Sequence, residues 1–211
     1  MSADFHQQME HGIPPSNFSM AIAEQNGLLS SGWREWIFLP DTMFRGKKEW
    51  WGEWKERVRP HEGVDICYYR TDLGAVCRLE EGFSVPAAYD GTVIKICRDF
   101  LGETVFMRHG LRGGKGRILV SASGHMVPSE KIAPDRFVAA GEIVGRVALP
   151  QKKQKVPPHL HFSLGWLEAE SLIHELDWEF VANDPRMSLV DPLILFRGRY
   201  SVLSFLDNEK E

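Results

Sequence analysis

The sequence predicts a mainly β fold, in which many short strands form a barrel or a sandwich. The prediction rests on residues 61 to about 165, where short runs rich in valine and isoleucine alternate with glycine, proline and aspartate. No stretch of this region carries apolar residues at helical spacing over a useful length. The clearest expected strands are Val64–Cys67, Gly91–Ile96, Thr104–Met107 and Ile118–Val120.

Two segments of this β region resemble each other. Residues 85–96 and residues 138–148 both run through small residues, reach a glycine and enter a strand of β-branched residues. In the first segment Tyr89-Asp90-Gly91 has the composition of a turn that precedes a strand. The repetition indicates an internal duplication.

The two ends of the chain differ from the β region. Five of the seven tryptophans lie within residues 33–54, and they either pack against a flank of the core or form an aromatic wall beside a substrate groove. Apolar residues at helical spacing over 168–181 predict a short helix. We therefore expect an N-terminal extension, 1–57, partly wrapping the barrel, a β domain over 58–200, and a tail over 201–211.

Composition excludes several classes of protein. Of 211 residues 43% are hydrophobic and 26% are charged, which are ordinary values for a globular protein. The net charge of −4 disfavours nucleic acid as a partner, because phosphate binding needs a concentrated cationic face. No long basic stretch stands out, although 151–155 is locally basic. Cys67, Cys77 and Cys97 form no CxxC pair, and we interpret them as small buried residues, with one bridge plus a free thiol as the alternative.

The first residues have neither the basic nor the apolar region of a signal peptide. No run approaches the roughly 20 apolar residues that span a bilayer, so we expect no transmembrane segment. Two compartments therefore stay open: the cytoplasm, or the cell envelope with an export signal that is not part of this sequence.

The candidate metal ligands begin with His61 and Asp65, in His-Glu-Gly-Val-Asp. A spacing of four places the two side chains on the same side of an extended strand. Imidazole nitrogen and carboxylate oxygen are both zinc ligands. Alone, this pair also fits an ordinary surface contact.

A second motif is Pro-Pro-His-Leu-His-Phe, residues 157–162. In a strand His159 and His161 point the same way, while Leu160 and Phe162 point into a core. Two neighbouring imidazoles on a half-buried strand are costly unless something binds them, although a solvent-facing pair on an edge strand is the alternative. A further histidine, His125, follows the expected strand Ile118–Val120.

Taken together, these motifs resemble the lysostaphin-like (LytM-type) zinc metalloendopeptidases. The shared elements are His61–Ile66, Pro86–Ile96, His125, Gly141–Gly145 and His159–Phe162, and the resemblance covers about residues 58–196. It implies a small antiparallel β barrel-sandwich hybrid, the duplicated hybrid motif. It also implies hydrolysis of a peptide bond in peptidoglycan cross-links, so the expected partner is a peptidoglycan peptide or another peptide.

The resemblance also implies a role for each position. His61, Asp65 and His161 would hold one Zn²⁺ per chain, and His125 and His159 would be the catalytic histidines that assist a metal-activated water. Three protein ligands leave one zinc position open, as catalytic rather than structural zinc sites do. A neutral histidine can accept a proton from water, and a second can stabilise the oxyanion or protonate the leaving amine.

Two other functions fit the same fold. A phosphocarrier would use two neighbouring histidines to carry a phosphoryl group and would not need Asp65. A non-catalytic relative would bind or regulate at the cell wall, although such relatives usually lose metal ligands, and all five expected positions are filled here. A latent form, in which His6, His11 or Asn17 supplies a fourth ligand, is a further alternative.

Overall fold

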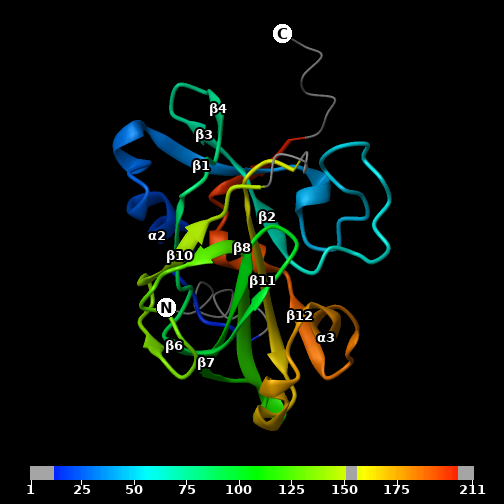
Figure 1. The fold of residues 1–211 in the computed structure, drawn as a ribbon. Coiled ribbons are helices and arrows are strands. Elements are labelled where there is room, and N and C mark those ends of the chain that lie inside the picture. The colour runs from blue at the N-terminus through cyan, green and yellow to red at the C-terminus, as the bar shows by residue number, and fades with distance from the viewer. Residues whose placement is uncertain (1–11, 151–155, 204–211) are drawn as a thin grey trace, which may run out of the picture.

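The computed structural model describes residues 12–150 and 156–203 of the chain. Figure 1 shows strands gathered in the centre, with helix α2 against one side and helix α3 against another. The α-helices are α2 Phe18–Gln25 and α3 Trp178–Asn183. The strands are β1 Trp33–Phe38, β2 Val64–Ile66, β3 Tyr68–Thr71, β4 Val76–Arg78, β5 Ser84–Pro86, β6 Gly91–Arg98, β7 Glu103–Arg112, β8 Ile118–Pro128, β9 Phe137–Val138, β10 Ile143–Val147, β11 Leu160–Leu167, β12 Met187–Val190 and β13 Tyr200–Val202.

The strands form two sheets, and the prediction of a mainly β, antiparallel fold is confirmed. The larger sheet runs β12-β11-β8-β7-β6-β9, with β2 pairing on β11 and with β10 joining β8 to β5. The smaller sheet runs β13-β1-β3-β4, and within it β1 and β13 pair in parallel. Neither sheet of the described residues closes into a full barrel, in keeping with a barrel-sandwich hybrid.

The two similar segments interlock. The first supplies β5 and β6, and the second supplies β9 and β10; β5 pairs with β10, and β6 pairs with β9. Between the strands, Ala87 N–H donates to the Glu142 carbonyl and Gly141 N–H donates to the Ala87 carbonyl. Each segment therefore pairs with the other rather than with itself, as expected of a duplicated motif.

Alternating side chains of the central strands divide the apolar residues between two clusters. Along β7, Val105 and Met107 face the larger cluster, while Phe106 between them faces a smaller cluster that α3 covers. On β11, Leu160 and Phe162 are both 1% exposed and lie in the larger cluster, as the strand alternation predicts. This period of two places His161 on the opposite side of β11 from the main core.

The N-terminal residues that the structure describes share this core. Ile13, Phe18 and Ile22 are buried in the same cluster as Phe162, and the Phe18 and Phe162 ring centroids lie 4.4 Å apart. Strand β1 pairs with β3 and β13. The division into 1–57, 58–200 and 201–211 stays a prediction, and its parts 1–11 and 204–211 lie outside the described residues.

Several local predictions can be compared with the described residues. The helix expected over 168–181 is two helices, a 3-10 helix Glu170–His174 and α3, because the Asp177 side chain accepts from Phe180 N–H and starts a new N-terminus. All three cysteines are free, and burial raises the pKa of Cys67 to about 12, so its thiol stays protonated. The basic stretch 151–155 lies outside the described residues, and no described helix is long and apolar enough to span a membrane.

Candidate metal centre

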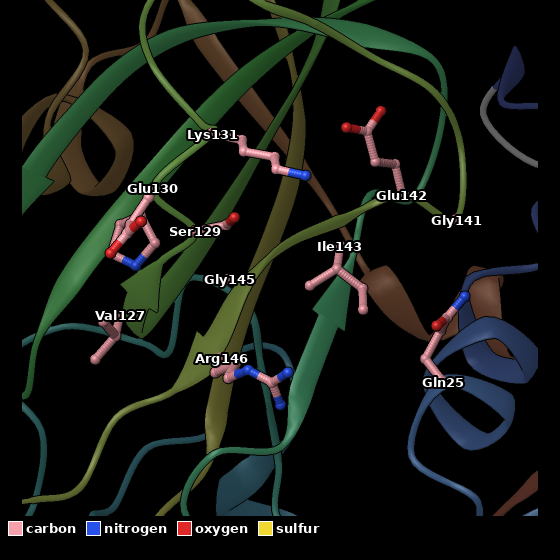
Figure 2. Close-up of a pocket in the computed structure, with 11 residues that line it drawn as sticks. Gln25, Val127, Ser129, Glu130, Lys131, Gly141, Glu142, Ile143, Gly145 and Arg146 are labelled. Atoms are coloured by element: carbon pink, nitrogen blue, oxygen red, sulfur yellow. The ribbon is translucent and has the colours of Figure 1, made fainter.

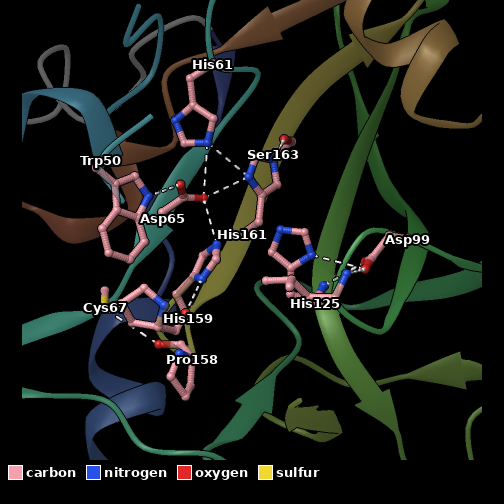
Figure 3. A network of polar contacts seen from close by, with 12 residues as sticks. Trp50, His61, Asp65, Cys67, Asp99, His125, Pro158, His159, His161 and Ser163 are labelled. Carbon is pink, nitrogen blue, oxygen red and sulfur yellow. Dashed lines mark hydrogen bonds and ion pairs between the residues drawn. The ribbon is translucent and has the colours of Figure 1, made fainter. Parts of the chain in front are cut away.

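The ladder between β2 and β11 builds the centre of the site. It places Asp65 directly opposite His161, with Leu160 paired to Ile66 on one side and Phe162 paired to Val64 on the other. Gly63 makes this ladder possible, because a Cβ at that position would collide with the Phe162 carbonyl. Residues almost a hundred positions apart are thereby fixed side by side (Figure 3).

Three donor atoms converge at this point. His61 Nε2 lies 3.1 Å from Asp65 Oδ1 and 3.0 Å from His161 Nδ1, and His161 Nδ1 lies 2.9 Å from Asp65 Oδ1. Ligands about 2.0–2.1 Å from a tetrahedral zinc ion would lie about 3.3 Å apart, so a small expansion of this triangle fits such an ion. The three residues are the group that could hold a metal ion among the described residues.

Hydrogen bonds behind the ligands orient two of these nitrogens. His61 Nδ1 lies 3.0 Å from the Met43 carbonyl, which can only accept, so Nδ1 carries the proton and Nε2 offers its lone pair. His161 Nε2 lies 3.0 Å from Ser163 Oγ, an acceptor for the Nε2–H when Nδ1 faces an ion. The tautomers that these partners support are those that a metal requires.

Burial and charge favour the metal-binding protonation states. Burial would raise the pKa of Asp65, but the neighbouring imidazoles of His61, His159 and His161 hold it well below its usual range. Burial lowers the pKa of His161 against the raising effect of Asp65. A carboxylate and a neutral imidazole are therefore present at neutral pH.

The two candidate catalytic histidines stand beside this triangle. His159 is 1% exposed, and its Nε2 lies 3.7 Å from Asp65 Oδ1. Its Nδ1–H donates to the Pro157 carbonyl at 2.8 Å, so Nε2 bears the lone pair. Burial lowers the pKa of His159 to about 4. The ring of His125 stands edge-on to that of His159, with the centroids 4.8 Å apart.

A bulge in β8 aims His125 at the site. Between the pairs Glu103–Met126 and Val105–Ser123 the strand β8 has one residue more than β7, and His125 has a positive φ of 63°. Asp99 holds this strained residue twice, because Oδ2 accepts its backbone N–H at 2.8 Å and Oδ1 accepts from Nδ1 at 3.1 Å. Burial would raise the pKa of Asp99, but hydrogen bonds from His125 and Thr104 and the nearness of the His125 ring keep it below its ordinary value.

An open pocket of about 490 Å³ adjoins these histidines. Trp51 and Trp178 line it, and Trp178 stands edge-on to His161 with the ring centroids 4.8 Å apart. His125 and His161 both line the pocket, so a bound molecule can reach one candidate metal ligand, His161, and one candidate catalytic histidine.

The tryptophan-rich region divides between the core and the pocket. Trp33 and Trp36 are buried in the main core, whereas Trp51 lines the pocket. Trp50 is buried, and its indole N–H donates to Asp65 Oδ2 at 2.6 Å (Figure 3).

A second hollow of about 600 Å³ lies elsewhere, beside β8 and β10 (Figure 2). Lys131, Glu142 and Arg146 are among its lining residues, and none of the five predicted site residues is. The chemistry described above therefore belongs to the pocket at the histidines.

The structure brings all five predicted site residues together, and it adds partners that the sequence did not single out. Asp99, Trp50 and the Met43 carbonyl orient predicted residues, yet none of them belongs to a motif. For the latent form, Asn17 is exposed at the start of α2, and His6 and His11 lie outside the described residues.

The chain is similar to several known proteins. Among solved structures, the chain is similar to the catalytic domain of the prophage-encoded M23 protein EnpA from Enterococcus faecalis, at 22% identity and a TM-score of 0.38 over 60% of this chain and 79% of that one. It is also similar to LytU, at 17% identity and a TM-score of 0.43 over 71% of this chain and 78% of that one.

A third solved structure is lysostaphin from Staphylococcus simulans, at 16% identity and a TM-score of 0.40 over 78% of this chain and 53% of that one. The chain thus spans about half the length of lysostaphin. No curated protein matches the chain.

The family itself is given by a sequence model. The model of peptidase family M23 matches residues 59–171, which is more than half of the chain and includes all five predicted site residues. The resemblance drawn from the motifs is confirmed, and the chain is a metallopeptidase-type hydrolase that belongs to peptidase family M23.

Proposed function

We propose that the chain is a zinc-dependent metalloendopeptidase that hydrolyses a peptide bond in peptidoglycan cross-links. His61, Asp65 and His161 would be the zinc ligands, and His125 and His159 would act on the substrate. The observation that carries the proposal is the triangle of donor atoms, with sides of 2.9–3.1 Å, beside an open pocket.

The choice of zinc follows from the donor set. Two imidazole nitrogens and one carboxylate oxygen are ligands that suit Zn²⁺ in a catalytic site, since a further position stays open. When bound, Zn²⁺ activates a water molecule and polarises the scissile carbonyl. Cys67 is not among the three described residues whose ligand atoms converge at this point.

His125 and His159 have different hydrogen-bond partners, and each partner suits its histidine to a different proton transfer. His159 Nε2 carries a lone pair and is neutral at neutral pH, so it can accept the proton of the attacking water. His125 donates Nδ1–H to Asp99, which stabilises the imidazolium and lets Nε2 carry a proton to the oxyanion or the leaving amine.

The proposed substrate class is argued from the family and from the pocket beside the histidines. The similar structure of lysostaphin is described as that of an antimicrobial peptidase. For this chain we propose a peptidoglycan peptide as the substrate. Trp51 and Trp178 line the open pocket beside His161, where their apolar rings would pack against a bound peptide.

The test begins with bound metal. Elemental analysis of the purified wild type should give about one zinc per chain, and His161→Ala and Asp65→Ala should each lose it. Release of peptide amines from purified peptidoglycan should then follow zinc content. A wild type that takes up no zinc after reconstitution at neutral pH would contradict the proposal. A wild type that binds zinc but releases no peptide amines would contradict only the proposed peptidoglycan substrate.

A phosphocarrier makes a different prediction for the same variants. Phosphoryl transfer between histidines does not need Asp65, so Asp65→Ala would keep that activity. Membership in a peptidase family favours hydrolysis over this alternative.

A further inference from the structure

Part of the candidate metal centre comes from outside the residues that the family model matches. The model begins at residue 59, whereas the segment Met43–Arg57, which we term the tryptophan segment, precedes it. This segment supplies the carbonyl of Met43 to His61 and the indole N–H of Trp50 to Asp65. Two of the three candidate ligands therefore have a partner in it.

The contact of Trp50 acts on the oxygen of Asp65 that does not face the histidines. Asp65 Oδ1 faces His61 and His161, and Oδ2 accepts from Trp50 Nε1 at 2.6 Å. Arg57 also approaches Oδ2, at 3.5 Å, but its Nη2 makes no hydrogen bond with any described residue. The indole N–H is therefore the short, directional contact that fixes the rotation of the carboxylate.

Packing holds the indole itself in place. Trp50 is 3% exposed, and its ring stands edge-on to Trp51, Tyr68 and His159, with centroid distances of 5.4, 6.2 and 5.2 Å. A ring enclosed on these sides has a single orientation, so it can hold its partner at a constant angle. Its edge contact with His159 links the ligand Asp65 and a candidate catalytic histidine through one side chain.

We propose that Trp50 is a positioning residue of the metal centre, which orients the Asp65 carboxylate so that Oδ1 faces the ion. The inference rests on the proposed zinc site. It makes the tryptophan segment an outer layer of that site rather than a separate appendage. Outer partners of this kind typically change metal affinity by 10–100-fold.

The experiment compares two tryptophans that differ in the atom they bind. Trp50→Phe removes the indole N–H from Asp65, and Trp36→Phe removes an equally buried indole N–H that donates to Ser19 Oγ at 2.9 Å, inside the core. Zinc affinity is measured by competition with a chelator, and thermal unfolding of the metal-free proteins is recorded in parallel. We expect 10–100-fold weaker zinc binding in Trp50→Phe and wild-type affinity in Trp36→Phe.

A second variant separates the N–H from the volume of the ring. Replacing Trp50 with β-(3-benzothienyl)alanine keeps a bicyclic ring and substitutes sulfur for the N–H, so it should weaken zinc binding as Trp50→Phe does while folding like the wild type. Wild-type zinc affinity in this variant would overturn the inference, as would equal losses in the Trp50 and Trp36 variants. A wild type that binds no zinc would overturn the proposed function as well, so the two failures are distinguishable.

Discussion

Asp99 holds His125 through two atoms at once: one carboxylate oxygen accepts the backbone N–H, and the other accepts from the ring Nδ1. Thr104 donates to Oδ2 as well, at 2.7 Å, which leaves the carboxylate little freedom to turn. The residue that completes this part of the site thus lies 26 positions before the histidine it orients.

We predict that Asp99→Asn lowers kcat by about 10–100-fold and leaves bound zinc unchanged. General acid–base catalysis contributes about 10²–10⁴ in rate, and a histidine that loses its carboxylate partner keeps only part of it. The measurements are kcat on a peptide substrate, its pH profile and zinc content. Glu175→Gln removes a surface ion pair with Arg186 and should match the wild type. Zinc loss in Asp99→Asn would show that Asp99 supports the ligands rather than His125.

We predict that Trp51→Ala and Trp178→Ala raise KM severalfold while zinc stays bound. Both rings line the pocket beside the candidate ligands, and truncating either removes apolar surface that a bound peptide would cover. Initial rates over a range of substrate concentrations separate KM from kcat. If kcat falls and KM does not, the rings act on the histidines, which they contact, rather than on the substrate.

We predict that Gly63→Ala destabilises the protein by about 1–3 kcal/mol or more and weakens zinc binding. The added Cβ would meet the Phe162 carbonyl and Ser163 Oγ, and the strain of overpacking must push β2 away from β11. Urea unfolding and zinc titration measure the two effects. Gly110→Ala is the matched control, since a Cβ there meets nothing within 4 Å, and its effect should stay within about 0.5 kcal/mol. Equal stability of the two variants would contradict the close approach of the strands.

We predict that the metal-free protein loses stability as the pH falls from about 6.5 to about 4. His109 is 3% exposed, and burial lowers its pKa to about 4. In this pH window the unfolded chain binds a proton that the folded chain does not, so stability is fully present above the unfolded pKa and declines below it, by on the order of 3 kcal/mol at most for this residue.

The midpoints of urea unfolding, measured between about pH 6.5 and about pH 4 in the presence of a chelator, test this loss of stability. In His109→Gln the urea midpoint should depend less steeply on pH, because the variant lacks one of the groups that take up a proton on unfolding. Burial also lowers the pKa of His159 to about 4, so His159 still contributes to the pH dependence. An unchanged slope in His109→Gln would show that His109 does not contribute.

The sequence predicts those parts of the site that short motifs encode. His61 and Asp65 lie four apart, and His159 and His161 lie two apart, so strand geometry alone relates each pair. The ladder that joins the two pairs links positions 96 residues apart, and only the family resemblance related them. Their roles as ligands and catalytic groups stay predictions.

The residues that were missed act through tertiary contacts. Trp50 lies in a loop without periodicity, and nothing in its neighbours separates it from Trp51, yet one indole donates to Asp65 and the other lines the pocket. Asp99 lies in a turn, where aspartate is common for local reasons. The helix expected over 168–181 is divided in two because Asp177 caps the start of a new helix. The spacing of apolar residues does not reveal such a cap.

The interlocked β5, β6, β9 and β10 have a consequence for the order in which the chain is synthesised. When β5 and β6 leave the ribosome, the strands that cover their edges, β10 and β9, are still about 40–60 residues from being made. Unpaired edges are sites of aggregation, and pairings between distant residues form slowly. The nascent chain therefore passes through an interval in which half of the duplicated motif is exposed, and its yield in cells should depend on chaperones that shield strand edges until residue 147 has emerged.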